Sequence, residues 1–87
     1  MTSWEIRLSP DAGKVLRRAD RATQERLAAK INAIAADPLT ASKPLKDSAA
    51  RSARVGDWRI ILKLDRDVML VTITSIETRG QVYRRLP

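Results

Sequence analysis

The spacing of apolar residues divides the chain into three sections. Residues 3–8 alternate, with Trp4, Ile6 and Leu8 on one side and charged residues between them, which predicts a half-buried strand. Residues 10–36 carry apolar side chains at helical spacing, and from residue 51 onward the period returns to that of strands. One strand, then helices, then strands is the order that predicts an α+β fold.

Two helices are predicted in the middle section. Ser9 is a suitable N-cap and Pro10 stands at the first helical position, while Asp20 can cap a second, longer helix. The apolar stripe of the first helix is Ala12, Val15, Leu16 and Ala19, and that of the second is Leu27, Ile31 and Ile34, backed by Ala28 and Ala35. Asp37-Pro38 should end the second helix, because proline disfavours the helical conformation in the residue before it. The short connection predicts a helical hairpin.

The last section predicts an antiparallel meander. Thr40–Ala50 has the composition of a loop, and Gly56-Asp57 has that of a hairpin turn between two strands. Further strands are predicted over Trp58–Asp65 and Val68–Ile76, joined by a tight turn at residues 65–67. We expect residues 1–87 to form a single domain, with the helices packed on one face of the sheet.

Strand parity separates the arginines of this meander. Trp58, Ile60, Leu62 and Leu64 share a face that suits the core, and Arg59, Ile61 and Lys63 share the other. In the preceding strand, Arg54 has the parity of Ser52, and Arg51 points to the opposite face. By itself, this pattern is equally that of an exposed sheet face whose cations reach into water.

Composition and charge limit the chemistry. With 17 Lys and Arg against 10 Asp and Glu, the formal charge is +7, which favours a polyanion or an acidic protein as partner. The chain has no His or Cys, and its carboxylates are scattered, so we expect no metal site and no cofactor. Aromatic residues are only 3%, which predicts an aliphatic core. Neither a membrane span of about 20 apolar residues nor a secretion signal is visible, so we expect a soluble, cytoplasmic protein.

Two motifs near the end of the chain resemble those of the RelE/ParE toxin superfamily. Arg54-Val55-Gly56-Asp57-Trp58-Arg59 is similar to its R-V-G-D-[YW]-R strand pair, and Arg79-Gly80-Gln81-Val82-Tyr83 to its closing R-x-x-[VI]-Y element. The resemblance also covers the first strand, the helix that ends at Asp37-Pro38 and the loop with Lys43-Pro44-Leu45. It implies a toxin of a type II toxin–antitoxin system with a microbial RNase-like α+β fold and an acidic antitoxin as its partner.

The resemblance also implies an activity and its residues. Toxins of the RelE branch cleave messenger RNA on the ribosome without metal, and residues matching Arg59, Arg79 and Tyr83 act on the scissile phosphate. Arg54, on the preceding strand, is expected to assist. Further RNA or phosphate contacts are expected from Lys43, Lys46, Arg51, Lys63, Arg84 and Arg85. Operator DNA would be contacted only through the antitoxin complex.

One departure from the RelE pattern leaves the proton acceptor unassigned. Ala50 and Ser52 stand where that branch places basic catalytic residues on the strand. Glu77 is the one acid near the predicted site, and we expect it to pair with an arginine. Three functions therefore remain open: a ribosome-dependent endoribonuclease, a ParE-type inhibitor of DNA gyrase, and a catalytically weak co-repressor that acts by binding the antitoxin.

Overall fold

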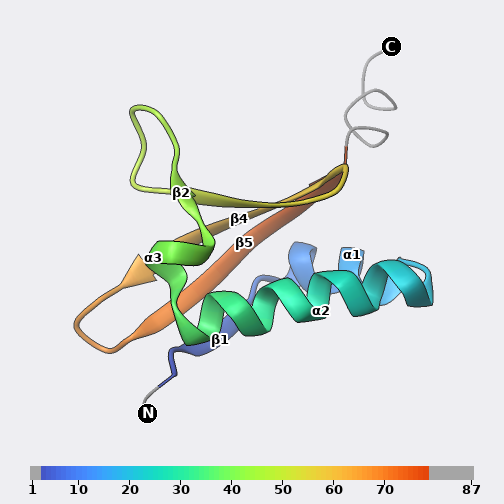
Figure 1. Cartoon of the computed structure of the whole chain (residues 1–87), viewed down its shortest axis with the longest axis horizontal. Helices are drawn as coiled ribbons and strands as arrows, with labels where there is room; N and C mark the ends of the chain where they lie inside the picture. The colour runs from blue at the N-terminus through green and yellow to red at the C-terminus, as the bar shows by residue number, and fades with distance from the viewer. Residues whose placement is uncertain (1–2, 79–87) are drawn as a thin grey trace.

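The computed structural model describes residues 3–78, in which helices cover one face of a five-stranded sheet (Figure 1). The elements in chain order are β1 (Glu5–Leu8), α1 (Pro10–Arg18), α2 (Arg21–Ala36), α3 (Pro38–Ala41), β2 (Lys43–Pro44), β3 (Arg51–Val55), β4 (Trp58–Asp65) and β5 (Leu70–Thr78). Within these described residues, no helix is both long and apolar enough to cross a membrane. The predicted α+β order of strand, helical hairpin and meander is confirmed.

The sheet places the first strand beside the last. Its strand order is β1-β5-β4-β3-β2, with β1 parallel to β5 and the other neighbours antiparallel. Gly56 has φ +58° in the two-residue turn between β3 and β4, a left-handed conformation that glycine adopts without steric cost. The predicted hairpin between Val55 and Trp58 is therefore confirmed.

Polar side chains set the beginning of α1 and hold the helical hairpin together. The Ser9 hydroxyl accepts the amide hydrogen of Ala12 at 3.1 Å, so Ser9 is the predicted N-cap. Asp20 stands at the N-cap of α2, but its side chain makes no capping hydrogen bond. Instead, Gln24 donates to the carbonyls of Leu16 and Arg17 at 2.9 and 3.1 Å. These bonds satisfy carbonyl groups at the end of α1 and fix the two helices to each other.

Asp37-Pro38 both ends one helix and begins another. α2 stops at Ala36, as predicted, and the Asp37 carboxylate then accepts hydrogen bonds from the amide and hydroxyl of Thr40, at 3.3 and 2.7 Å. With Pro38 at its first position, the chain turns at once into α3. The prediction of a loop over Thr40–Ala50 is therefore wrong at its start, which contains the end of α3 and the short strand β2.

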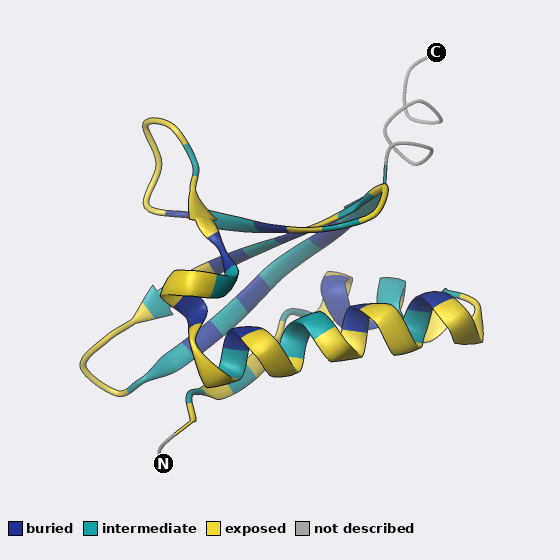
Figure 2. Cartoon of the chain, in the orientation of Figure 1, coloured by how far each residue is buried: buried dark blue, intermediate teal, exposed yellow. Residues whose placement is uncertain are grey.

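The core is aliphatic and lies between the helices and the sheet (Figure 2). Its buried members are Ala12, Leu27, Ile34, Ala53, Ile60, Leu62, Val71, Ile73 and Ile76. The predicted parity of β4 is confirmed, because Ile60 and Leu62 are buried while Arg59 and Lys63 are exposed. Ala28 is exposed, so it does not back the helical stripe as predicted.

The last hairpin differs from the prediction at both ends of β5. The turn after β4 extends through Met69, which has φ +51°, so the strand begins at Leu70 instead of Val68. Val68 lies in this turn with 65% of its surface exposed. The strand then continues to Thr78, two residues past the predicted end, because pairing with Trp58 of β4 continues that far.

A bulge in β5 changes which residues face the core. Ile60 pairs with Ile76 but Leu62 pairs with Ile73, so β5 has one more residue than β4 between these pairs, namely Thr74. The Thr74 hydroxyl donates to the Ile61 carbonyl at 3.3 Å, and its carbonyl accepts from Ser9 Oγ at 2.8 Å. Beyond the bulge, Ile76 faces the core and Glu77 faces away from it.

Candidate nucleic-acid interface

The sheet face turned away from the core, here called the open face, carries Ser52, Arg54, Arg59, Ser75 and Glu77. Arg54 of β3 pairs with Arg59 of β4, and Arg59 pairs with Glu77 of β5. The three side chains therefore form one row across three strands. Directly paired residues have Cβ atoms about 4.5–5.5 Å apart, which is close enough for Arg54 and Arg59 to bind one small anion, with Glu77 beside Arg59.

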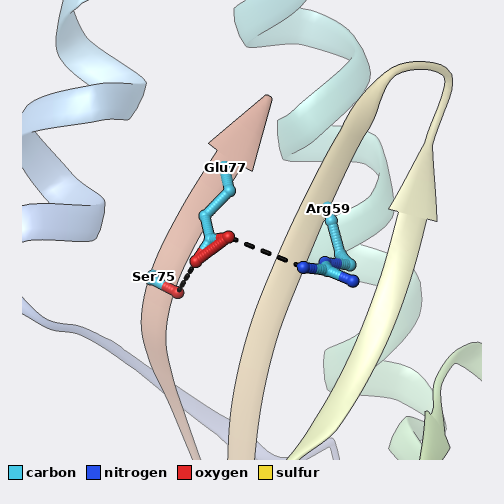
Figure 3. Close-up of polar contacts among 3 residues, drawn as sticks. All are labelled: Arg59, Ser75 and Glu77. Atoms are coloured by element: carbon cyan, nitrogen blue, oxygen red, sulfur yellow. Dashed lines mark hydrogen bonds and ion pairs between the residues drawn. The ribbon is translucent and has the colours of Figure 1, made fainter. Parts of the chain in front are cut away.

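The two arginines of this row have different partners. Arg59 Nη2 lies 3.6 Å from Glu77 Oε2 (Figure 3), whereas Arg54 Nε donates only to the carbonyl of Gly56, at 3.4 Å. Within residues 3–78, no carboxylate lies within ion-pair distance of Arg54. Like charges on directly opposed residues destabilise a sheet, so this pair has a cost that an anion bound between the two arginines would remove.

Glu77 is the acidic member of the site. The Ser75 hydroxyl donates to Glu77 Oε1 at 3.4 Å, on the side away from Arg59 (Figure 3). Its side chain is 35% exposed, against 69% for Glu5 and 72% for Glu25, the other glutamates in ion pairs. The expectation that Glu77 pairs with an arginine is confirmed. Because the pair is half-exposed, its contribution to stability is at most about 1 kcal/mol.

Other residues predicted to contact RNA lie around the row of Arg54, Arg59 and Glu77. Lys43 of β2 pairs with Ser52, which puts it on the open face, one row from Arg54 and Arg59. Lys63 is on the same face farther along β4, opposite Thr72, and Lys46 is exposed in the loop after β2. A cleft of about 750 Å³ adjoins the two arginines; its lining is Lys30, Thr40, Ala41, Ser42, Lys43, Ser52, Arg54, Gly56, Asp57, Trp58, Arg59, Glu77 and Thr78.

Arg51 is not brought together with the other arginines. Its guanidinium donates to the Ser42 hydroxyl at 2.7 Å, the Ser42 carbonyl at 2.8 Å and the Leu39 carbonyl at 3.2 Å. The Ser42 hydroxyl in turn donates to the carbonyl of Pro38. Arg51 therefore fastens β3 to α3 from the core side, as its parity predicts, and three of its hydrogen bonds already go to protein groups.

Four predicted site residues, Arg79, Tyr83, Arg84 and Arg85, lie outside the described residues. Ala50 is buried just before β3, and Ser52 stands on the open face without a charge. Across residues 3–78, no three acidic side chains converge on a point where they could hold a metal ion.

The sequence predicts that Glu77 pairs with an arginine, but it did not predict the β-bulge at Thr74 that positions Glu77. Counting by twos from Val71 and Ile73 places residue 77 on the core face, and the bulge at Thr74 reverses this. A signal was present in the sequence, since the buried apolar residues change spacing from two, between Val71 and Ile73, to three, between Ile73 and Ile76.

Comparison with known families identifies the chain. The model of a family described as the ParE toxin of the parDE type II toxin–antitoxin system matches residues 6–83. The chain belongs to this family. It is thus a type II toxin of the RelE/ParE superfamily, and the resemblance of its two sequence motifs is confirmed. No curated protein matches the chain significantly.

Solved structures of RelE toxins share this toxin's fold. The RelBE2 toxin–antitoxin complex of Mycobacterium tuberculosis is 24% identical over 92% of this chain and 95% of its own, with a TM-score of 0.76. The isolated RelE toxin of E. coli is 17% identical over 94% and 93%, with a TM-score of 0.77. The archaeal RelE–RelB complex of Pyrococcus horikoshii is 17% identical over 91% and 98%, with a TM-score of 0.74. At these identities, the similarity shows the fold.

Proposed function

We propose that this toxin is a metal-independent, ribosome-dependent endoribonuclease that cleaves messenger RNA and thereby stops translation. The observation that carries the proposal is the directly opposed pair Arg54 and Arg59 on the open face. Guanidinium groups stay charged and bind phosphate oxygens in a bidentate manner, so two of them side by side suit a phosphodiester. Their mutual repulsion favours an anion between them.

Cleavage of the phosphodiester needs few groups besides these two arginines. When the ribose 2′-hydroxyl attacks the adjacent phosphorus, negative charge builds on the phosphoryl oxygens, and fixed cations stabilise it. Arg54 and Arg59 supply that stabilisation. Thr78 pairs with Trp58, next to Arg59, and the sequence continues directly into Arg79 and Tyr83. We assign Arg79 a further phosphate contact and Tyr83 a stacking or orienting contact with the nucleotide.

The proposal is tested with purified toxin and ribosomes translating a defined messenger RNA, with cut sites mapped by primer extension. We expect cleavage by the wild type and a loss of about 100-fold or more in the Arg59→Ala variant, the usual effect of removing one group that stabilises developing charge. Arg21→Ala is the matched control, because Arg21 is an exposed arginine in an ion pair on α2 and the variant carries the same net charge. Uncut messenger RNA together with intact toxicity would refute the proposal.

A second candidate is inhibition of DNA gyrase. It is favoured by the family match and by two features of the site: Glu77 is paired with Arg59, and Ala50 and Ser52 stand where the RelE branch has basic residues. If this function is correct, induction of the toxin accumulates cleaved DNA–gyrase complexes while messenger RNA stays intact. Overexpression that leaves growth unchanged would instead support the co-repressor.

We further propose that an acidic antitoxin binds and neutralises this toxin in the cytoplasm, where ribosomes are found. The net charge of +7 supports an acidic partner, and two of the similar structures are complexes of a RelE toxin with its RelB antitoxin. We also propose that operator DNA is bound only by the complex of toxin and antitoxin, since the open face of the toxin is the surface that we propose to bind RNA.

A further inference from the structure

The row of Arg54 and Arg59 on the open face contains only one described group that can take a proton. Lys43, Arg54 and Arg59 carry protons already, and Ser52 and Ser75 are neutral hydroxyls. Glu77 is the carboxylate of this row, and in its ionised form it is purely an acceptor. The other carboxylates that strand register places on this face, Asp65 and Glu5, are both paired with Leu70, at the other end of β5. Attack by a ribose 2′-hydroxyl requires an acceptor within hydrogen-bond reach of the proton that is transferred.

The geometry of Glu77 leaves room for such a contact. A direct charge-assisted hydrogen bond between a guanidinium and a carboxylate measures about 2.7–2.9 Å, but Arg59 Nη2 and Glu77 Oε2 are 3.6 Å apart. Glu77 Oε1 accepts from Ser75 at 3.4 Å, which is also long for a hydrogen bond between oxygen atoms. The carboxylate is thus held next to the phosphate-binding arginine while both of its oxygens can still accept a strong hydrogen bond.

The position of Glu77 is built into the fold. The bulge at Thr74 puts Glu77 on the open face. Two hydrogen bonds hold that bulge: the Thr74 hydroxyl donates to the Ile61 carbonyl, and the Ser9 hydroxyl donates to the Thr74 carbonyl. An unbulged β5 would turn residue 77 into the core. Bulges of this kind are frequent next to active sites, where they redirect a side chain.

We propose that Glu77 is the proton acceptor of the cleavage reaction, a catalytic role that rests on the endoribonuclease function proposed above. The proton of the 2′-hydroxyl passes to the Glu77 carboxylate as the bond from O2′ to phosphorus forms. The bond from phosphorus to O5′ breaks, and O5′ takes a proton from a water molecule, whose hydroxide is neutralised by the proton on Glu77. The products are a 2′,3′-cyclic phosphate and a free 5′-hydroxyl, with Arg59 and Arg54 on the phosphoryl oxygens.

The test compares Glu77→Gln with wild type on programmed ribosomes, measuring toxin binding and the single-turnover cleavage rate separately. Glutamine keeps an oxygen that accepts from Arg59 but does not take a proton at neutral pH. We expect ribosome binding as tight as in the wild type or tighter, and cleavage slower by about 100-fold or more. Glu25→Gln makes the same substitution at an exposed glutamate of α2, and this variant should cleave messenger RNA at the wild-type rate. A smaller loss in Glu77→Gln overturns the assignment.

A second variant separates loss of chemistry from loss of structure. Glu77→Ala should regain cleavage when formate is added, because the small carboxylate can occupy the vacated position, whereas Arg59→Ala should not respond to formate. Failure of formate to restore any cleavage in Glu77→Ala, with the fold intact by circular dichroism, also overturns the assignment. If the wild type itself leaves messenger RNA uncut, the proposed function fails, and this outcome is distinct from both results on Glu77.

Discussion

The two faces of β3 use the same residue type for opposite purposes. Arg51 points toward α3, where three hydrogen bonds to Ser42 and Leu39 occupy its guanidinium. Arg54, three residues later, is exposed on the open face and donates only one long hydrogen bond, to the turn at Gly56. The difference shows that net charge alone does not mark a nucleic-acid contact. A cation is available to a phosphate only where the fold leaves its donors unused.

The largest effect should come from the core that supports both faces. Ile60 is fully buried on β4, and Ile60→Ala should lower the free energy of unfolding by about 2–5 kcal/mol through lost burial and a cavity. Urea denaturation followed by circular dichroism measures this. Ile61→Ala is the control, because Ile61 points to the open face and is only half-buried. Equal losses in the two variants would contradict the assignment of faces.

A smaller effect on stability should distinguish Arg51 from Arg54. Arg51→Ala removes the donor to the hydroxyl and carbonyl of the buried Ser42 and should cost about 1–3 kcal/mol in the free energy of unfolding. Arg54→Ala removes a side chain in water and should change that free energy by no more than about 0.5 kcal/mol. Both are measured by the same urea titration. If the order were reversed, the structural role of Arg51 would be wrong.

The smallest effect concerns the salt dependence of RNA binding, for which Arg54 should matter and Arg51 should not. Binding of single-stranded RNA weakens with salt, and each phosphate contact contributes about 0.7 to the slope of log K against log salt concentration. Arg54→Ala should lower that slope by about this amount, whereas Arg51→Ala should leave it unchanged. Fluorescence anisotropy of a labelled oligonucleotide at several salt concentrations gives both slopes. Two equal slopes would remove the distinction between the faces of β3.

Local signals in the sequence predict most of the fold. Ser9-Pro10 sets the start of α1 and Asp37-Pro38 the end of α2, because caps and proline act within a few residues. The alternation from Trp58 to Leu64 fixes the faces of β4, and it places Arg59 on the open face. These features depend on neighbours in the chain, so the sequence suffices to find them.

The features that sequence reasoning missed depend on distant residues. The end of α3 lies in the segment predicted as a loop, since a four-residue helix is too short to show a period, and its C-terminal side is held by Arg51 of β3. The bulge of β5 depends on a hydrogen bond from Ser9. For that reason counting along β5 could not place Glu77, although the expectation that it pairs with an arginine was correct.

The parallel pairing of β1 with β5 has a consequence for the time at which the toxin becomes active. Ser9 and Thr74 are 65 residues apart, so a ribosome adding about 5–20 residues per second makes β5 about 3–13 s after β1. Until then β1 has no strand to pair with, and the row of Arg54, Arg59 and Glu77 lacks its acidic member. The sheet edge and the row of Arg54, Arg59 and Glu77 are therefore completed together, once β5 has been made.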